Sequence, residues 1–316
     1  MRVCIIGAGP SGLYTAKFLA QNNHQVTIFE KSNTIGGLYK YAQIPKKLDV
    51  FKKILLSDKI KVISNVEINE KNFKEIEADF DAFVLASGGL PIYHKNKDLL
   101  EATNVIERIM AGDTSLKLGQ NVLIIGMGNV ALDLVKLLFG SFELGLSEEI
   151  KNTLKQVRNV DVLSRSTILN GKFTNSVMRD VLGMKDVSIK LINSEHNSLS
   201  ATNPSEIRRL RMFNKLEEEL ENQTGSRSLS LVFSRQIQDI KRKGSLFTVN
   251  FCNGLTKAYD TVISSFGFVS NAIKLDTNKP VFKIGWCTTP RGNVSEAYNQ
   301  AKLLSIELDQ KLNKLR

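Results

Sequence analysis

The sequence has few cysteines and lacks long apolar runs. Its three cysteines, Cys4, Cys252 and Cys287, form neither a C-x-x-C pair nor a spacing typical of metal ligands. A disulfide scaffold, a metal site and a dithiol redox centre therefore have no support, and scattered thiols suit a reducing compartment. No run approaches the roughly 20 apolar residues of a membrane-spanning helix. We therefore expect no transmembrane segment.

Acidic residues are also in deficit. The 316 residues include 43 Lys and Arg against 32 Asp and Glu, a formal net charge of +11. Such an excess suits nucleic acid, acidic lipid or an acidic protein partner, or is spread over a solvated surface. Because no basic stretch interleaves with aromatic residues, we expect no nucleic-acid partner. The length allows two domains, and the predicted first strand leaves no room for a cleavable signal or transit peptide before it.

The first glycine motif follows a strand. An apolar run over residues 3–6 breaks into Gly7-x-Gly9-x-x-Gly12, and helical apolar spacing begins at Leu13. The first glycine permits a tight turn, the second lets the backbone approach a pyrophosphate, and the third lets the helix pack on the strand. Free N–H groups and the helix dipole then favour phosphate. This order predicts a dinucleotide site, the alternative being a turn that binds nothing.

The second strand supports the same interpretation. An apolar run over residues 26–29 ends in Glu30. This acid follows Gly12 at close to the spacing of about 20 residues expected for a ribose-binding carboxylate. We therefore predict that Glu30 binds a ribose with free hydroxyls, as FAD has.

A second unit repeats the motif. Residues 121–133 again run from an apolar strand into a helix, with Gly126, Gly128 and Ala131 at the small-residue positions. The next strand, over 161–163, is followed by Ser-Arg165-Ser rather than by an acid. An arginine there suits the 2′-phosphate of NADP, unless Arg165 is merely an exposed loop cation. Two nucleotide sites in one chain indicate electron transfer between the two bound dinucleotides. The alternative is a structural repeat in which one of the sites has been lost.

No low-complexity linker separates the two units, so an insertion explains the order of motifs best. We predict an α/β fold with two Rossmann-like dinucleotide-binding domains, the NADP-binding domain inserted within the FAD-binding domain. The FAD-binding domain comprises 1–106 and 268–316, and the NADP-binding domain comprises 107–267. Apolar strands over 81–89 and 260–267, each ending in small residues, close the first part and the inserted unit.

The glycine motifs resemble those of adrenodoxin reductase-type ferredoxin–NADP reductases, members of the two-dinucleotide flavoprotein superfamily. Residues 7–16 resemble the family's FAD loop, and the G-x-G-N-V-A-L-D form of 126–133 resembles its NADP loop. Residues 161–174 resemble the segment that carries the 2′-phosphate arginines, and 285–286 resemble the C-terminal flavin segment. The resemblance extends from residue 1 to about 310, in a chain shorter than is usual for the family.

The resemblance implies two sets of binding residues and no catalytic side chain, because the cofactors carry the hydride. The implied FAD contacts are Gly7, Gly9, Pro10, Ser11, Gly12, Glu30, Gly37, Leu38, Ile68, Trp286, Asn293, Val294 and Ser295. The implied NADP contacts are Gly126, Met127, Gly128, Asn129, Val130, Arg165, Ser166 and Asn293.

Several positions depart from the family pattern. Ser166 stands where a second arginine is expected, which leaves NADH use open. Lys46-Lys47 replace a histidine expected near the flavin, and Val177, with Arg179 and Asp180 nearby, stands where a glutamate is expected. Asn293 replaces a glycine, and Trp286 stands where many relatives have Asp. These changes bear on rate and cofactor preference more than on fold.

The resemblance implies hydride transfer from NADPH to FAD and then passage of single electrons to an acidic [2Fe–2S] ferredoxin. Arg208, Arg209 and Arg211 are the predicted docking patch, unless they are solvated helix charges. A disulfide reductase shares the layout but needs a cysteine pair, and a non-catalytic nucleotide sensor or scaffold would explain the short chain. The implied compartment is a mitochondrion-type matrix, with the cytoplasm as the alternative, and the oligomeric state is left open.

Overall fold

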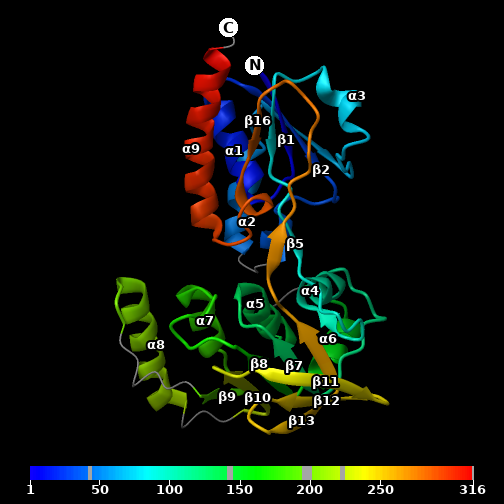
Figure 1. The fold of residues 1–316 in the computed structure, drawn as a ribbon, viewed down its shortest axis with the longest axis vertical. Coiled ribbons are helices and arrows are strands. Elements are labelled where there is room, and N and C mark those ends of the chain that lie inside the picture. The colour runs from blue at the N-terminus through cyan, green and yellow to red at the C-terminus, as the bar shows by residue number, and fades with distance from the viewer. Residues whose placement is uncertain (42–44, 141–144, 194–200, 221–224, 315–316) are drawn as a thin grey trace. The chain divides into compact units, whose positions relative to one another are not determined.

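The computed structural model describes residues 1–41, 45–140, 145–193, 201–220 and 225–314. It divides into two compact units, residues 1–90 with 268–316 and residues 91–267 (Figure 1). Each unit is a parallel sheet with helices, so the predicted α/β fold, with one nucleotide-binding unit inserted in the other, is confirmed. The sequence predicts the first boundary at residue 106, but residues 91–106 lie in the second unit, where residues 100–101 pair with its sheet.

The first unit is built on a five-stranded parallel sheet in the order β16-β4-β1-β2-β3. Its strands are β1 (Arg2–Ile6), β2 (Gln25–Glu30), β3 (Ile60–Ser64), β4 (Ala82–Leu85) and β16 (Val281–Lys283). Its helices are α1 (Pro10–Gln21), α2 (Pro45–Ile54), α3 (Phe73–Glu77) and α9 (Val294–Asn313), with short 3-10 turns η1 (Gly37–Tyr41) and η3 (Gly285–Cys287).

Alternation along β1 directs its side chains to two cores. Val3 and Ile5 belong to the apolar cluster that includes residues of α1, α2 and α9. Cys4 and Ile6 belong to the cluster on the opposite face, which includes Phe73 at the start of α3. Figure 1 shows α1 and α9 side by side on one face of the sheet and α3 on the other. Apolar side chains therefore pack against both faces of the sheet at β1.

The second unit is built on a six-stranded sheet in the order β6-β14-β7-β8-β10-β9, with every neighbouring pair parallel. Its strands are β6 (Leu100–Glu101), β7 (Asn121–Ile125), β8 (Asn159–Leu163), β9 (Val187–Ile192), β10 (Arg227–Val232) and β14 (Thr261–Ser264). Its helices are α4 (Ala102–Met110), α5 (Asn129–Leu138), α6 (Glu148–Gln156), α7 (Asn175–Leu182) and α8 (Pro204–Leu220).

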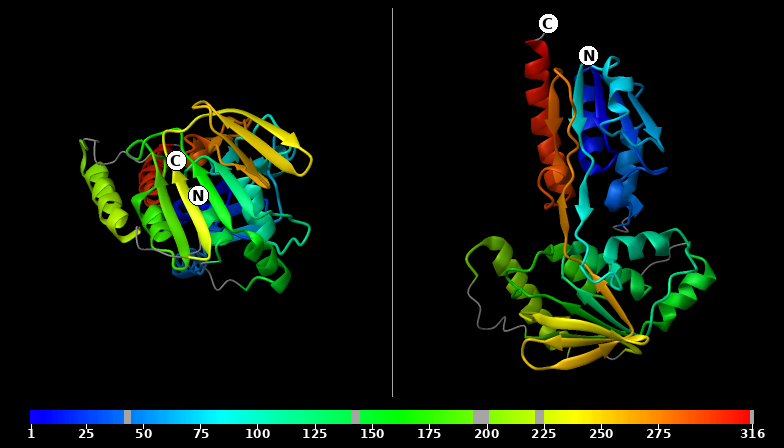
Figure 2. Two further views of the ribbon diagram at one scale, coloured as in Figure 1. Left: turned by 90° about the horizontal axis from the view of Figure 1, so that it is seen from below. Right: turned by 45° about the vertical axis from the view of Figure 1, so that its right-hand side comes forward.

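A three-stranded antiparallel meander covers one face of this second sheet. It consists of β11 (Ile237–Lys243), β12 (Leu246–Phe251) and β13 (Thr256–Tyr259). Leu123 and Leu163 of the sheet share an apolar cluster with Phe247, Val249 and Phe251 of the meander. Helices α4, α5 and α7 lie on the opposite face (Figures 1 and 2). The meander therefore closes the face that helices leave open.

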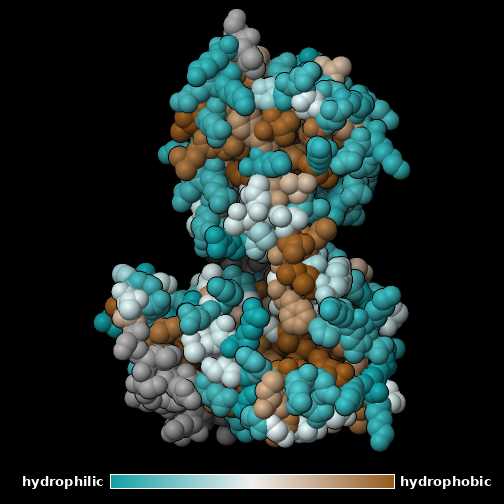
Figure 3. All heavy atoms as spheres, viewed as in Figure 1, coloured by the Kyte–Doolittle hydropathy of each residue, from teal (hydrophilic) through white to brown (hydrophobic). Residues whose placement is uncertain are grey.

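The chain leaves the first unit and returns to it along one strand pair, β5 (Gly89–Pro91) with β15 (Phe268–Ser270). On the face seen in Figure 3, apolar side chains gather along this pair. Exposed apolar residues in and beside it are Leu90, Tyr93, Phe266 and Val269.

Among the described residues, no helix is long and apolar enough to cross a bilayer.

The long C-terminal helix α9 packs along α1. The rings of Tyr14 and Tyr298 meet edge to face at 5.1 Å. Farther along, His24 Nε2 lies 2.5 Å from Asp309 Oδ1. Between these contacts Leu308 is fully buried. Because α9 and α1 share one apolar core, the C-terminal helix is an integral part of the first unit.

Truncating Leu308 to Ala should lower the free energy of unfolding of the first unit by about 2–5 kcal/mol, because it opens a cavity in this core. Leu303→Ala is the matched control on the same helix, since Leu303 is 68% exposed, and it should change stability by about 0.5 kcal/mol or less. Urea unfolding followed by the fluorescence of Trp286, the single tryptophan, measures both. Equal losses would contradict the packing of α9 described above.

Candidate functional site

In each unit the strand order reverses beside the strand that precedes the glycine motif. Strand β1 lies between β2 and β4, and β7 lies between β8 and β14. Open parallel sheets bind ligands outside the carboxyl ends of the strands at such a reversal. The two predicted glycine loops leave the sheets at these points.

The first loop makes a turn that only glycine fits. Gly7 has φ 108°, its N–H donates to Phe29 O at 2.8 Å, and a Cβ there would collide with Ala86 O. A Cβ at Gly12 would collide with Gly7 O. At Gly9, in contrast, a Cβ would have nothing within 4 Å of it. The backbone is thus closely packed at Gly7 and Gly12, while the space beside Gly9, between them in the sequence, is open.

Helix α1 points its start into that space. Gly9 is its N-cap residue, no side chain caps it, and Pro10 occupies the first position. The first N–H groups of a helix have no partner within the helix, so the N–H groups of Ser11 and Gly12 are available to an anion. A helix start of this kind attracts phosphate through its N–H groups and dipole.

Glu30 is fixed before any ligand arrives. Its side chain is buried, with Oε2 accepting from Ala8 N–H at 2.7 Å and Oε1 accepting from Ser32 N–H and Ser32 Oγ at 2.9 Å. The carboxylate therefore faces the glycine loop, and its remaining lone pairs suit ribose hydroxyls.

Two distant segments reach the same loop. Gly36 N–H donates to Ala8 O at 2.8 Å, and a Cβ at Gly37 would lie 3.3 Å from Gly9 Cα. A Cβ at Gly285 would collide with Ser11 Oγ. The predicted FAD residues Gly37, Leu38 and Trp286 thus belong to segments that border the first loop.

Asn293, predicted to contact both nucleotides, caps α9. Its Oδ1 accepts from Ser295 N–H at 2.9 Å and Glu296 N–H at 3.1 Å, and Val294 begins the helix. The side-chain oxygen is therefore already engaged. Ile68 is 6% exposed within an apolar cluster, which makes its side chain a core group.

The second loop reproduces the first. Gly126 also has φ 108°, its N–H donates to Leu163 O at 2.9 Å, and a Cβ there would collide with Ser265 O. Gly128 has nothing within 4 Å of its missing Cβ. It is the N-cap residue of α5, and no side chain caps that helix. This second open space has the same backbone groups available as the first.

Side chains around the second loop have different surroundings. Met127 is buried, so only its backbone can face a ligand, whereas Val130 is half-buried. Asn129 Oδ1 accepts from Thr174 N–H at 2.8 Å. This bond fastens the residues before α7 to the loop, and sequence reasoning missed Thr174 because nothing local marks a partner so distant in the chain.

The residues after β8 give the second loop a positive neighbour, whereas the first loop has the acidic Glu30. Arg165 is exposed, and its guanidinium has no hydrogen bond or ion pair within the described part of the chain. Ser164 Oγ accepts from Ser166 N–H at 3.1 Å, which closes a small turn under Arg165. A cation on this turn lies where Glu30 lies in the first unit.

Asp133, the last residue of the second glycine motif, is held in a buried ion pair. Lys136 Nζ lies 2.5 Å from Asp133 Oδ1, and both side chains are largely buried. Burial raises the pKa of Asp133, against the opposing effect of Lys136. The residues Val177, Arg179 and Asp180 lie on α7, where Arg179 and Asp180 are exposed. The side chains of Lys46 and Lys47 lie outside the described part of the structure.

The docking role predicted for Arg209 is wrong. Arg209 is 9% exposed, and its guanidinium donates to the carbonyls of Ile168, Leu169, Gly171 and Phe173 at 2.8–3.0 Å. It organises the segment before α7 and cannot meet a partner. Its helical neighbours Arg208 and Arg211 are exposed.

The cysteines do not form a redox pair. Cys4 and Cys287 are free and buried in the first unit, and Cys252 is free and exposed in the second. Burial raises the pKa of Cys4 to about 12 and also raises that of Cys287. A reactive cysteine needs a lowered pKa, so these two thiols are structural. No cluster of potential metal ligands occurs among the described residues.

Comparison with known proteins places these features in a family. Residues 1–292 match the family described as pyridine nucleotide-disulphide oxidoreductase. A probable mitochondrial NADPH:adrenodoxin oxidoreductase of Dictyostelium discoideum is 31% identical over 241 residues, 65% of this chain and 44% of that protein. Glutamate synthase [NADH] of Schizosaccharomyces pombe is 31% identical over 190 residues, 51% of this chain and 8% of that protein.

The fold has close structural neighbours. FprA of Mycobacterium tuberculosis, solved in complex with NADPH, superposes with a TM-score of 0.83 at 17% identity, covering 99% of this chain and 84% of that one. The chain spans less than half the length of the two relatives named above. The resemblance to adrenodoxin reductase-type reductases is confirmed, and the chain belongs to the pyridine nucleotide-disulphide oxidoreductase family of NAD(P)H-dependent flavoproteins, with FAD and NADP(H) as its cofactors.

Proposed function

We propose that the chain takes a hydride from NADPH onto FAD and passes single electrons to an acidic [2Fe–2S] ferredoxin. The observation that carries this proposal is the pair of equivalent glycine loops with unlike strand ends, a buried Glu30 in one and an exposed Arg165 in the other. The adrenodoxin-linked name of the Dictyostelium relative supports the choice of acceptor.

The first unit is the proposed FAD-binding domain. The N–H groups of Ser11 and Gly12 would hold the pyrophosphate, and Glu30 would accept from the ribose hydroxyls. A carboxylate at that place repels a 2′-phosphate, which FAD lacks. The bordering segments at Gly37 and Gly285 would then shape the space beyond the loop.

The second unit is the proposed NADP-binding domain. The N–H groups at the start of α5 would hold the pyrophosphate, and Arg165 would bind the 2′-phosphate. An arginine can donate two parallel hydrogen bonds to one phosphate, which adds both energy and geometric selectivity. The side-chain oxygen of Asn129 is occupied by Thr174 N–H, so Asn129 would contribute only N–H donors.

The chemistry needs no side-chain acid or base. FAD, when bound, would supply the hydride acceptance and the one-electron release, while the protein supplies binding, orientation and electrostatics. The family departures at Lys46-Lys47 and Val177 are therefore compatible with transfer. They would affect the rate through orientation and local charge.

Two other functions have less support. A disulfide reductase needs a cysteine pair, and Cys4 and Cys287 are buried thiols with raised pKa values. A nucleotide sensor or scaffold remains the rival, and the colour of the purified protein separates it from an enzyme. The mitochondrial location of the Dictyostelium relative supports a matrix-type compartment for this chain, with the cytoplasm as the alternative.

The purified protein should be yellow, and anaerobic NADPH should bleach its visible absorbance. NADH should do so only at higher concentration, because it offers Arg165 no 2′-phosphate. Stopped-flow absorbance at equal concentrations of the two nucleotides measures the preference. A colourless protein that stays colourless after incubation with FAD would favour the sensor or scaffold.

Gly9→Ala should weaken FAD binding by roughly 10- to 100-fold without unfolding the protein, because its methyl group enters the open space and blocks phosphate bonds worth about 1.5–3 kcal/mol. Gly145→Ala is the control, since Gly145 is also open and follows the C-terminal end of α5, whereas the second loop precedes its N-terminal end. Flavin content and the thermal melting curve measure both effects. Normal flavin content in Gly9→Ala would refute the first site.

Reversing Arg208 and Arg211 together to Glu should raise the KM for ferredoxin by about tenfold at low ionic strength, since rim charges steer encounter. NADPH-dependent dye reduction should be unchanged. Lys71→Glu with Lys302→Glu, which reverses two exposed lysines of the first unit, is the charge-matched control. Equal loss of ferredoxin and dye reduction would reject docking at α8.

A further inference from the structure

A second arginine lies next to the turn that carries Arg165. Strand β10 runs parallel to β8, and hydrogen bonding between the two segments continues past their ends. Ser166 O accepts from Ser234 N–H at 3.2 Å, and Ser164 O accepts from Arg235 N–H at 3.0 Å. Ser234 takes φ 51°, a left-handed conformation that turns the chain here. Arg235 therefore stands beside the position where Ser166 replaces an expected arginine.

The side chain of Arg235 contacts an aromatic ring. Its guanidinium carbon lies 5.7 Å from the centre of the Phe251 ring, within reach of a cation–π contact. Across the described part of the chain it makes no side-chain hydrogen bond or ion pair. All five of its N–H donors are thus available while its stem is positioned.

Arg235 borders an open polar groove of about 370 Å³. The other lining residues are neutral and are Asn193, Ser234, Gln236, Cys252 and Asn253. Asparagine, glutamine and serine side chains can donate to phosphate oxygens. The groove lies at the carboxyl ends of β9 and β10, the sheet edge that also carries Arg165. Its lining suits a polar anion.

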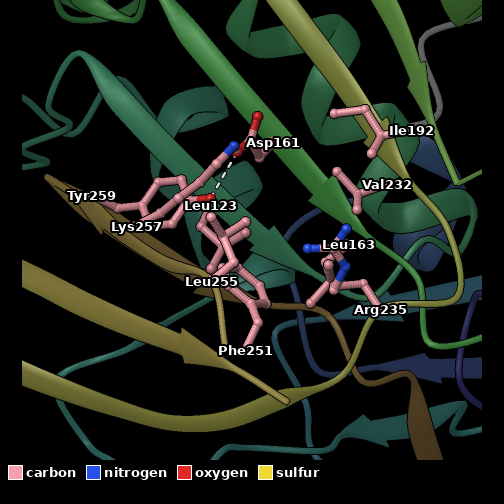
Figure 4. A pocket seen from close by; sticks show the side chains of 10 residues that line it. All are labelled: Leu123, Asp161, Leu163, Ile192, Val232, Arg235, Phe251, Leu255, Lys257 and Tyr259. Atoms are coloured by element: carbon pink, nitrogen blue, oxygen red, sulfur yellow. Dashed lines mark hydrogen bonds and ion pairs between the residues drawn. The ribbon is translucent and has the colours of Figure 1, made fainter. Parts of the chain in front are cut away.

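The neighbouring carboxylate does not neutralise Arg235. Asp161 lines a small cavity that Arg235 also borders, and Figure 4 shows the two at opposite ends of it, with Arg235 beside Leu163. Asp161 Oδ2 accepts from Tyr259 Oη at 2.7 Å and from Lys257 Nζ at 3.1 Å. Because Lys257 balances the charge of Asp161, the positive charge of Arg235 remains available to a ligand.

We infer that Arg235 is a second 2′-phosphate ligand, acting with Arg165 to select NADP(H) over NAD(H). This inference rests on the proposed NADP site in the second unit. The paired arginines of the family come from adjacent positions after one strand, whereas this chain draws its two guanidinium groups from neighbouring strands. A 2′-phosphate held between them would be bound from two directions.

Calorimetric titration of the FAD-loaded protein with 2′,5′-ADP and with 5′-AMP tests the inference without turnover, since only the first carries a 2′-phosphate. Wild type should prefer 2′,5′-ADP. Arg165→Ala and Arg235→Gln should each weaken 2′,5′-ADP by roughly 10- to 100-fold, the range for a lost hydrogen bond to a charged group, and leave 5′-AMP unchanged. Glutamine keeps most of the stem that packs on Phe251.

Arg242→Gln is the matched control, because the guanidinium of Arg242 also lies over a meander ring, 5.3 Å from the centre of Phe247, and pairs with Asp98 away from the groove. It should bind both nucleotides as wild type does. An affinity of Arg235→Gln for 2′,5′-ADP within twofold of wild type, with Arg165→Ala weakened, would overturn the inference and leave the NADP site standing. Equal affinity of wild type for both nucleotides would overturn the two together.

Discussion

The structure depends on how closely a helix can approach the strand before it. At both glycine loops the chain reverses so tightly that a Cβ on Gly7 or Gly126 would strike the backbone that follows the neighbouring strand. Gly12 lies against the carbonyl of Gly7, and Ala131 is fully buried at the matching place. This closeness brings the helix start over the strand end. The backbone atoms that build this turn are therefore the same ones that a nucleotide bound at the loop would contact.

Such a loop has strong consequences for prediction from sequence. Its requirement is local, since the residues that must be small lie within one turn of one another, and the sequence displays them directly. The strands β1 and β7, the helices α1 and α5, and the insertion of one unit in the other could all be predicted for this reason. The position of Glu30 beside the first loop could be predicted as well, because its spacing from the loop is fixed by the length of α1 and β2.

Contacts between distant segments could not be predicted. Arg209 and Arg208 are adjacent in a charged helix, yet one is enclosed by four carbonyls and the other is exposed. Only the path of residues 168–173 makes the difference, and a helical pattern carries no information about that path. The first domain boundary is predicted too late in the chain for a similar reason. Strand β6 has only two residues, and only its pairing with β14 places it in the second unit.

The two loops also differ in how rigid the neighbouring charged side chain is before a nucleotide binds. Glu30 is buried and already accepts three hydrogen bonds, so a ribose bound there would meet a carboxylate whose position is set. Arg165 is exposed, and fixing its flexible side chain against a phosphate costs conformational entropy. Arg235, packed on Phe251, has less freedom to lose. Selectivity for the 2′-phosphate would therefore be gained more efficiently from the arginine beside Phe251 than from the exposed one, although only the exposed one stands in a recognisable motif.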